Sequence, residues 1–223
     1  SLALLKFFTV LTSLGAKESL ALSFRHMNDD PQNHIRVIPP LLRREVTLHE
    51  PYSGDYIHGY MVNAGFSENV MKWHRQHPGI PLRFFWDKWE EEPVKRVDNT
   101  LSFYQLDDVE FLRQMAGCKA YASTAGFESV CEAMYLGKPI LMVPAHIEQD
   151  CNAYDAEKSG AGIISSDFNL QQLLEFAKDY HPNRDFVYWV RGAEYTLLNL
   201  LESDSSNYQQ VLFNEMYLVE EFI

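Results

Sequence analysis

The chain has 223 residues, of which 46% are hydrophobic and 22% charged, and its formal net charge is −12. An apolar share of this size is ordinary for a globular protein and excludes a disordered or low-complexity chain. Only 19 Lys and Arg residues stand against 31 Asp and Glu residues. This balance disfavours nucleic acids and anionic membrane surfaces as partners, because both are bound mainly through cations.

The sequence has three cysteines, Cys118, Cys131 and Cys151. Their number is odd, their spacing is wide, and no C-x-x-C pair occurs, so neither a disulfide framework nor a cysteine zinc site is expected. We interpret them as buried free thiols of a reducing compartment, which predicts a cytoplasmic location.

The first 45 residues are a poor match to a self-contained domain. Residues 2–11 form an apolar, helix-like stretch that Lys6 interrupts and that is too short to cross a bilayer, which takes about 20 residues. A short strand is predicted at 35–38, and Pro39 and Pro40 end it with an extended backbone. Since the chain does not begin with Met, we expect residues 1–45 to be the remnant of a preceding domain plus an interdomain linker.

A regular alternation of strands and helices begins near residue 52. Strands are predicted at 56–62, 81–86, 101–104, 119–123, 139–144 and 160–164. Helices are predicted at 67–76 with Ser67 as the cap, 107–117, 127–136, 150–159 and 170–180, with more helix from 183. Such alternation predicts βαβ units, and hence an α/β fold with a Rossmann-like parallel sheet flanked by helices on both faces over 46–202. A break at 203–206 precedes a C-terminal helical tail, 203–223.

Ligands of open parallel sheets bind at the carboxyl ends of the strands, over helix N-termini. The junction at 123–129 is rich in small and hydroxylated residues, and Gly126 permits a close backbone approach. Free amides at the helix start can hold a diphosphate without any lysine, which suits so acidic a chain. Glu132 lies one turn after Glu128, and a carboxylate there can accept both hydroxyls of a ribose. The alternative is a solvated helix face with a serine cap.

A second polar junction follows the apolar strand at 139–144. His146, Glu148, Gln149 and Asn152 both donate and accept hydrogen bonds, as a sugar requires. The same residues make a poor metal site, because no second histidine is near and H-E-x-x-H is absent, so no metal site is expected. Neither a G-x-S-x-G elbow nor a P-loop occurs, and Cys151 has no activating partner beyond His146.

The stretch from Ser123 to Asn152 reads STAGFESVCEAMYLGKPILMVPAHIEQDCN. It resembles the donor-binding signature of GT-B fold glycosyltransferases. These include the UDP-glycosyltransferases and the N-acetylglucosaminyltransferase of peptidoglycan synthesis, and the stretch is most similar to a bacterial branch of uncharacterised glycosyltransferase-like proteins. The resemblance implies the C-terminal, donor-binding half of a two-domain enzyme. It also implies a fragment that is inactive alone, whose catalytic residues lie in the absent N-terminal domain.

The resemblance assigns roles to individual residues. Glu132 corresponds to the ribose-binding glutamate, Ser129 and the amides near Gly126 to the diphosphate contacts, and Glu148 with Gln149 to the pair that reads the donor sugar. Leu106 lies where the family packs the base, and the loop of Gly65 and Ser67 approaches the diphosphate. The complete set of expected donor-binding residues is Gly65, Ser67, Leu106, Thr124, Gly126, Phe127, Ser129, Glu132, His146, Glu148, Gln149 and Asn152.

Two positions depart from the plant-type pattern. Thr124 stands where a histidine is usual, and Glu128 stands where an asparagine is usual. A carboxylate beside a diphosphate is unfavourable unless it points away or meets a cation, which leaves the identity of the donor open. His146 is either the source of that positive charge or a plain structural histidine.

The leading hypothesis is transfer of a sugar from a nucleotide-activated donor, expected to be UDP-linked, to an acceptor. The expected partners are the nucleotide-sugar, the chain's own N-terminal domain and that acceptor, with membrane contact only through the missing domain and no cofactor beyond the donor. Two alternatives stay open: a nucleotide-sugar 2-epimerase, which shares the two-domain fold, and a nucleotide-sugar-binding module that has lost catalysis.

Overall fold

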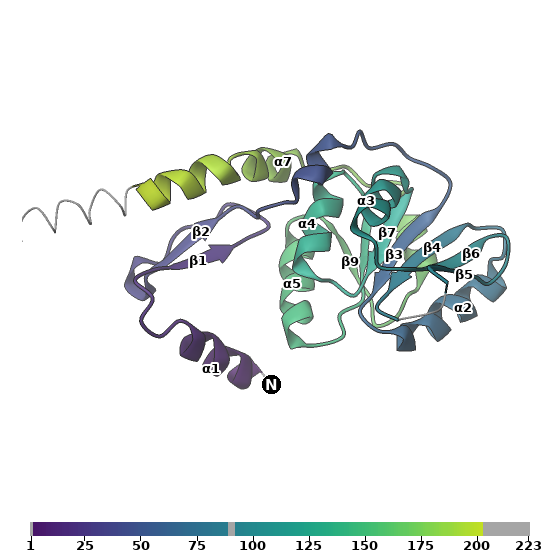
Figure 1. Cartoon of the computed structure of the whole chain (residues 1–223), viewed down its shortest axis with the longest axis horizontal. Helices are drawn as coiled ribbons and strands as arrows, with labels where there is room; N and C mark the ends of the chain where they lie inside the picture. The colour runs from purple at the N-terminus through teal and green to yellow at the C-terminus, as the bar shows by residue number, and fades with distance from the viewer. Residues whose placement is uncertain (1, 89–91, 203–223) are drawn as a thin grey trace, which may run out of the picture.

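The computed structural model describes residues 2–88 and 92–202. Figure 1 shows an α/β unit built from the middle of the chain. The N-terminal segment forms an arm to one side of this unit, and the last described helix, which ends near residue 200, extends to the same side. The tail predicted at 203–223 lies outside the described residues.

The α/β unit is built on one sheet, which has seven strands in the part of the chain that the structure describes. Their spatial order is β5-β6-β4-β3-β7-β8-β9. Six strands run parallel: β3 (Ile57–Met61), β4 (Leu82–Trp86), β6 (Leu101–Gln105), β7 (Ala120–Ser123), β8 (Ile140–Met142) and β9 (Gly162–Ile164). The predicted Rossmann-like parallel sheet is therefore confirmed, with the strand order reversing between β3 and β7.

One strand of this sheet was not predicted. β5 (Val94–Arg96) pairs antiparallel with β6 at the edge of the sheet. It has three residues and carries Lys95 and Arg96 at exposed positions, so it lacks the apolar run by which the other strands were recognised. Edge strands tolerate such charges because one of their sides faces water.

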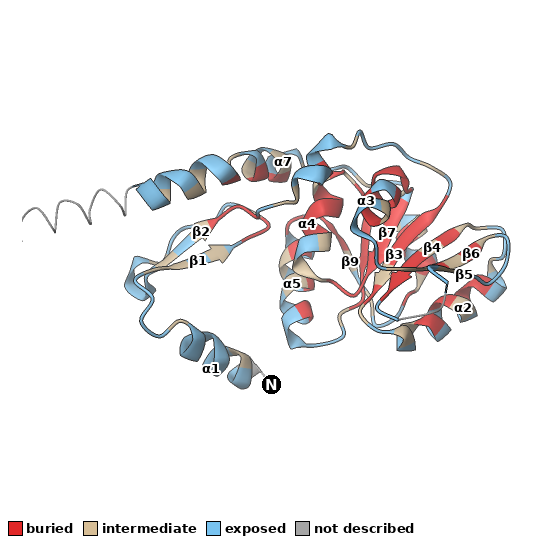
Figure 2. Cartoon of the chain, in the orientation of Figure 1, coloured by how far each residue is buried: buried red, intermediate tan, exposed pale blue. Residues whose placement is uncertain are grey.

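Helices cover both faces of the sheet, as predicted. On one face lie α3 (Asp108–Gly117), α4 (Phe127–Tyr135), α5 (Ile147–Lys158) and α7 (Arg184–Arg191), and their apolar side chains share a core with Phe85, Tyr121 and Ile140. On the other face α2 (Ser67–Gln76) and α6 (Leu170–Phe176) enclose a second core around Phe84, Phe103 and Leu141. Residues 193–202 continue as helix beyond α7. Figure 2 shows the strands buried between these helices.

Several helix ends confirm or correct the caps predicted from the sequence. Asp107 caps α3 by accepting the Glu110 amide at 2.8 Å, and Gly137, with φ of 68°, follows the end of α4. The predicted cap at Ser67 is wrong: Ser67 is the first residue of α2, and its hydroxyl donates back to the Ala64 carbonyl of the preceding turn at 2.7 Å. That turn is instead capped by Asn63.

Two other boundaries move. α5 begins at Ile147, three residues before the predicted Asp150, because Glu148 and Asp150 suit the positive end of a helix and the backbone turns at the extended His146. α6 ends at Phe176 rather than at residue 180, and a turn at residues 177 and 178 leads to an irregular segment before Pro182, which disfavours helix just before it.

The N-terminal arm consists of α1 (Leu2–Thr12), β1 (Ser19–Leu22), a turn at Pro31–Asn33, and β2 (Ile35–Ile38). The helix-like stretch and the strand at 35–38 are thus confirmed. β1 and β2 form a parallel pair of their own, whereas parallel sheets in proteins are normally larger and covered on both faces. Apolar residues of α1 are exposed, among them Leu4, Phe7 and Phe8 at 61–66%. In the described residues no helix is long and apolar enough to span a membrane.

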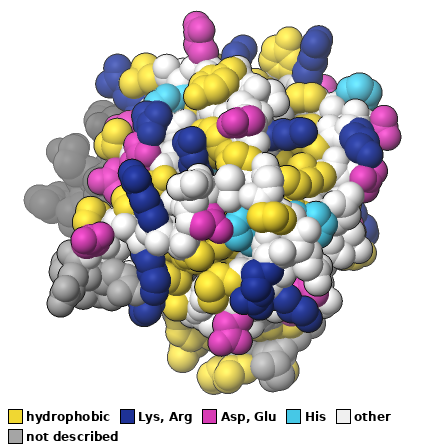
Figure 3. All heavy atoms as spheres, turned by 90° about the vertical axis from the view of Figure 1, so that its right-hand side faces the viewer, with side chains coloured by type: hydrophobic (Ala, Val, Ile, Leu, Met, Phe, Trp, Pro, Cys, Tyr) yellow, Lys and Arg dark blue, Asp and Glu magenta, His cyan; other side chains and the backbone are white. Residues whose placement is uncertain are grey.

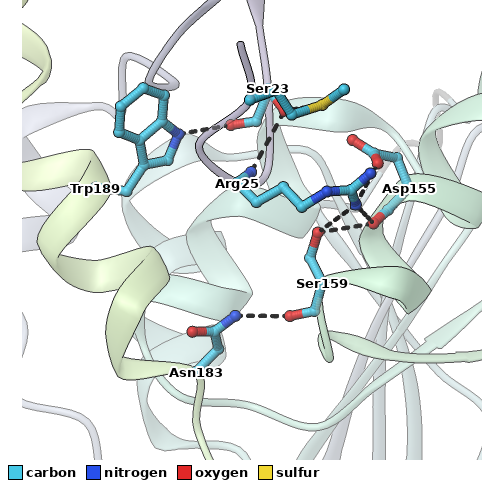
Figure 4. Close-up of polar contacts among 7 residues, drawn as sticks. Ser23, Arg25, Asp155, Ser159, Asn183 and Trp189 are labelled. Carbon is cyan, nitrogen blue, oxygen red and sulfur yellow. Dashed lines mark hydrogen bonds and ion pairs between the residues drawn. The ribbon is translucent and has the colours of Figure 1, made fainter.

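Polar contacts fasten the tip of the arm to the α/β unit (Figure 4). The Trp189 indole of α7 donates to the Ser23 carbonyl at 3.0 Å, and Arg25 meets Asp155 of α5 at 2.6 Å. Phe24, 1% exposed, packs against Phe127 at the start of α4 with a ring separation of 4.7 Å. The arm tip therefore contacts three helices, one of which begins at the strand-end pocket described below.

The linker after β2 lies on the α/β unit. Pro39 and Pro40 are buried, and the short helical turn at Arg44–Leu48 places Val46 in the core at 0% exposure. Burial on this scale anchors the segment, so Arg43, which precedes the turn, is held over the ends of the strands.

The surface carries both signs of charge. In Figure 3 the Lys and Arg side chains are scattered among Asp and Glu over the described part of the face shown, without joining into one basic stripe.

Candidate functional site at the carboxyl ends of the strands

A cavity of about 260 Å³ lies at the carboxyl end of the sheet, beside the point where the strand order reverses. Its lining comes from the linker, the end of β3, the loop after β6, α3 and the start of α4. The lining residues are Arg43, Tyr60, Leu106, Asp108, Phe111, Gly126, Phe127, Glu128, Ser129 and Glu132. Five of the predicted site residues are therefore brought together here: Leu106, Gly126, Phe127, Ser129 and Glu132.

The N-terminus of α4 opens on this cavity. Gly126 is its first flanking residue, and no side chain of the described residues caps the helix. The Ser129 hydroxyl donates back to the Gly126 carbonyl at 3.1 Å, which leaves the amides of the first turn without a side-chain acceptor. Uncapped amides at the positive end of a helix favour an anion.

Backbone geometry before α4 is unusual at Ala125, not at Gly126. Ala125 has φ of 61°, the left-handed region that non-glycine residues seldom adopt, whereas Gly126 has φ of −64°. The Ser123 hydroxyl accepts the Ala125 amide at 3.0 Å and stabilises the turn. The sequence had pointed to the neighbouring glycine, since an alanine gives no signal of positive φ.

The deepest polar group of the cavity is the Glu132 carboxylate, whose side chain is 0% exposed. Arg43 of the linker binds it with two hydrogen bonds, from Nε to Oε1 at 2.6 Å and from Nη2 to Oε2 at 2.7 Å. The remaining guanidinium nitrogen, Nη1, donates to Asp108 at 2.9 Å. The linker and α4 thus meet in a bidentate ion pair of the kind that arginine forms best.

This ion pair has a clear electrostatic cause. Burial raises the pKa of the Glu132 carboxyl, against the lowering effect of the Arg43 hydrogen bonds. The hydrogen bonds to Glu132 raise the pKa of Arg43 above its ordinary value. The short bidentate contact with Arg43 supplies the counter-charge that the buried Glu132 carboxylate needs.

The wall opposite α4 is largely apolar. Leu106, which follows β6, is 52% exposed at the mouth of the cavity, and Tyr60 and Phe111 stand edge to face at 6.1 Å. An apolar wall facing hydrogen-bonding groups is typical of sites for small ligands that combine a flat apolar part with a polar part.

Three further predicted residues do not line the cavity. Thr124 is 0% exposed, and its hydroxyl accepts the Val62 amide at 3.3 Å, which ties β3 to β7. The Gly65 amide donates to the Asn63 side chain at 2.9 Å, and Ser67 is used within the same turn. These groups stabilise the ends of the strands and the turns that follow them.

The second junction divides into buried and exposed residues. Gln149 is 5% exposed, and its Oε1 accepts the Ala145 amide at 2.8 Å, so it braces the loop before α5. His146 and Glu148 are exposed, and Asn152 donates to Glu148 at 3.4 Å. None of these four residues lines the cavity with Glu132. No cluster of three metal-binding side chains occurs among them or elsewhere in residues 2–88 and 92–202.

The expectation of three buried thiols is wrong for one of them. All three cysteines are free, Cys118 and Cys131 are buried, and Cys151 is exposed on α5. Cys151 occupies the second residue after Gln149 on the helix, and this step turns it away from the core.

A larger hollow of about 510 Å³ lies at the opposite end of the strands, beside Pro139. Its buried cation, Lys138, donates to the Tyr52 and Cys118 carbonyls at 2.7 and 2.9 Å, and burial lowers its pKa. These bonds hold the start of β7 to the segment before β3. Because ligands of such sheets bind at the carboxyl ends of the strands, we assign the candidate site to the smaller cavity.

Sequence reasoning missed four residues that line the site, namely Arg43, Tyr60, Asp108 and Phe111. Tyr60 and Phe111 look like ordinary core residues in the sequence. Arg43 is 89 residues from its partner Glu132, and no local pattern reports a contact at that separation.

Comparison with solved structures supports the fold. The chain is similar to the kitacinnamycin glycosyltransferase (14% identity, 84% of this chain and 54% of that chain, TM-score 0.59). It is also similar to Arabidopsis thaliana UGT89C1 complexed with quercetin (15% identity, 77% and 51%, TM-score 0.55). The calicheamicin glycosyltransferase CalG4 is a third (14% identity, 76% and 48%, TM-score 0.54). The chain thus spans about half the length of these proteins.

Sequence comparison gives a more specific result. A Caenorhabditis elegans protein named as a UDP-glucuronosyltransferase, ugt-48, is 26% identical over 105 residues, which are 46% of this chain and 20% of that protein. The family model described as glycosyl transferase family 1 matches residues 9–180, which contain the whole strand-end cavity. Because this match covers most of the chain, and the strand order and the signature at 123–152 agree with it, the chain belongs to glycosyl transferase family 1.

Proposed function

We propose that this chain is the donor-binding half of a glycosyltransferase that transfers a sugar from a UDP-linked donor to an acceptor. The observation that carries the proposal is the cavity itself. It combines the uncapped N-terminus of α4 with a buried carboxylate at the point where the strand order reverses, in a member of glycosyl transferase family 1. The named activity of ugt-48 supports uridine diphosphate as the nucleotide.

The geometry suggests how a donor would lie. The diphosphate would accept hydrogen bonds from the free amides of α4 and would contact Ser129. The base would lie against Leu106, and the ribose would lie on the Glu132 side of the cavity. The sugar would then extend toward Glu148 and Asn152 at the start of α5. In this arrangement the amides, which are fixed before the reaction, stabilise the charge that grows on the leaving diphosphate.

We further propose that residues 1–45 belong to the boundary with an N-terminal domain that supplies the acceptor site and the catalytic base. The exposed apolar face of α1 and the isolated parallel pair of β1 and β2 support this, because both features normally lie inside a larger structure. The 54% share of the kitacinnamycin enzyme that the chain covers supports it as well. A bacterial origin and a cytoplasmic location stay predictions of the sequence.

Titration calorimetry tests donor binding. We expect UDP and a UDP-sugar to bind, ADP to bind more weakly, and Glu132→Ala to weaken both uridine ligands. Glu148→Ala should weaken only the UDP-sugar, and Asp150→Ala, which removes an equal charge from the same turn, should weaken neither. If no nucleotide binds either to this chain or to a longer protein that contains it, the proposal is wrong.

The non-catalytic binding module is the second candidate, and one observation favours it. Asp108, Glu128 and Glu132 line the cavity together, which is unfavourable for the charge that builds up on a leaving diphosphate. Sugar transfer, or hydrolysis of a UDP-sugar, by the longer protein would exclude a module without catalysis. Epimerised product in the absence of an acceptor would instead indicate the 2-epimerase.

A further inference from the structure

We propose that Arg43 of the linker is a ligand-binding residue of this cavity: it stays on Glu132 and turns its third nitrogen from Asp108 to an anionic oxygen of the ligand. The inference rests on the proposed function for the class of ligand, a nucleoside diphosphate. It adds a residue outside the signature at 123–152, and a cation in a cavity that His146, the cation suggested by the sequence, does not line.

The three nitrogens of the Arg43 guanidinium have unequal partners. Nε and Nη2 are held at 2.6 and 2.7 Å by Glu132, whose side chain is fully buried. Nη1 is held at 2.9 Å by Asp108, whose side chain is 78% exposed. An exposed carboxylate is easily exchanged, because water replaces the lost contact at little cost. The buried pair therefore fixes the plane of the guanidinium and leaves one edge of it free to exchange partners.

The charge of the cavity calls for such a group. Of the described residues that line it, Arg43 is the sole cation, and it stands among the carboxylates of Asp108, Glu128 and Glu132. An incoming diphosphate would meet net negative charge there, and the α4 amides alone offset only about half an elementary charge. A planar guanidinium matches phosphate oxygens in geometry as well as in charge.

The position of Arg43 in the chain has a second consequence. The linker that carries it runs from the buried Pro40 to Val46, so its path is fixed on both sides of the arginine. Arg43 therefore enters the cavity from a segment that is anchored at both ends, so its guanidinium needs little reorganisation to meet a ligand.

The same ion pair allows the opposite role. Because Arg43 occupies both oxygens of Glu132, it would compete with a ribose that needs them. The two roles differ in sign: removal of a ligand-binding arginine weakens an anionic ligand, and removal of a competitor strengthens it.

Titration calorimetry with UDP, UMP and inorganic pyrophosphate distinguishes the two roles of Arg43. We expect Arg43→Gln to weaken UDP about tenfold or more, and UMP by less, because the lost charge–charge interaction grows with ligand charge. Arg43→Lys should recover part of the loss. Asp108→Asn should tighten UDP several-fold, since the guanidinium no longer has a competing carboxylate. Arg44→Gln, which removes the same charge from the neighbouring exposed residue, should leave all three affinities unchanged.

The outcomes are distinct. UDP affinity that is equal or higher in Arg43→Gln overturns the role of Arg43 and leaves the proposed function standing. A loss that is equal for UDP and UMP indicates a structural effect and also overturns it. If Arg43→Gln fails to fold, Asp108→Asn decides alone, and unchanged or weaker UDP binding counts against the proposal. If no nucleotide binds either to this chain or to a longer protein that contains it, but pyrophosphate does bind and only Arg43→Gln abolishes its binding, the proposed function fails while Arg43 stands as an anion site. If pyrophosphate does not bind either, both fail.

Discussion

Glu132 and His58 are two buried ionisable side chains in very different surroundings. Glu132 has a bidentate partner in Arg43, whereas His58, 0% exposed, lies among the rings of Phe85, Phe111 and Tyr121. In the described part of the chain neither ring nitrogen of His58 has a hydrogen-bond partner. Burial, together with the nearby Arg83, lowers the pKa of His58 to about 3.

The Glu132 pair predicts a stability effect. Glu132→Gln removes the charge and leaves the Arg43 guanidinium, which is 26% exposed, without its main acceptor. We expect the free energy of unfolding to fall by about 2 kcal/mol, at the lower end for a broken buried pair because Arg43 can reach water. Urea unfolding of Glu132→Gln and of Asp108→Asn measures this. Loss of the exposed Asp108 contact should cost less than about 0.5 kcal/mol, and equal losses for both variants would contradict the assignment.

His58 predicts a pH dependence. Its pKa is about 3 in the folded chain against 6.5 in the unfolded chain, so below pH 6.5 the unfolded state binds the extra proton. Above pH 6.5 His58 is neutral in both states and does not lower the free energy of unfolding. As the pH falls from 6.5 toward 3, the free energy of unfolding declines, because only the unfolded chain takes up the proton. At pH 5 this penalty, the loss in free energy of unfolding relative to neutral pH, is about 2 kcal/mol.

His58→Leu should remove this penalty. Urea unfolding at pH 7.5 and at pH 5 is the measurement, and the loss of stability between the two should be smaller in the variant by the amount given above. Tyr121→Phe is the matched control, because it removes a buried polar atom that does not titrate in this range. If His58→Leu loses as much stability as the wild type, His58 is not the titrating group.

At the residue level the sequence predicted the site only in part. Gly126, Ser129 and Glu132 were found because they lie close together in the sequence, at one strand-to-helix junction and the first turns of α4. Arg43 was missed because its contact with Glu132 spans 89 residues, and Gln149 was expected at a ligand because its bond to the Ala145 backbone has no signature in the sequence.

The elements of the α/β unit were predictable because each parallel strand carries buried apolar residues between polar or glycine-containing junctions. A run such as 139–144 needs no knowledge of its neighbours, and its flanking Gly137 and polar junction mark where it begins and ends. Two features depend on partners instead. β5 exists only because β6 offers it an edge, and the start of α5 depends on how Gln149 braces the preceding loop.

The end of α4 gives a prediction at this scale. Gly137 has φ of 68°, and a Cβ added there would lie 3.1 Å from Pro182, whereas Gly160 after α5 has φ of 74° with open space around it. Gly160→Ala should cost about 1 kcal/mol for the backbone alone. Gly137→Ala should cost more, because the contact with Pro182 adds to it. Chemical denaturation of both variants checks the order, and an equal cost would show that Pro182 yields freely.

For the whole molecule, the question is how the arm is held. Trp189, Arg25 and Phe24 connect its tip to α7, α5 and α4, and the polar contacts among them are partly exposed. Contacts of this kind contribute little to global stability, but they set which local openings are frequent.

The double variant Trp189→Phe and Arg25→Ala should therefore loosen the arm without unfolding the α/β unit. We expect hydrogen exchange over residues 13–38 to accelerate about tenfold or more, while the urea midpoint changes by less than the equivalent of 1 kcal/mol. Arg36→Ala, which breaks a pair within the arm, is the control for charge loss. Unchanged exchange over 13–38 would mean that Phe24 alone holds the arm.

The seven-stranded sheet also has a property that concerns other chains. Its outermost strands, β5 and β9, have only three residues each, while the strands they cover are equally short or longer. A three-residue edge offers few unpaired amides and carbonyls to an approaching strand, and Lys95 and Arg96 repel further pairing on the β5 side. The short strand that no sequence pattern revealed therefore protects the five residues of β6 from serving as a template for aggregation.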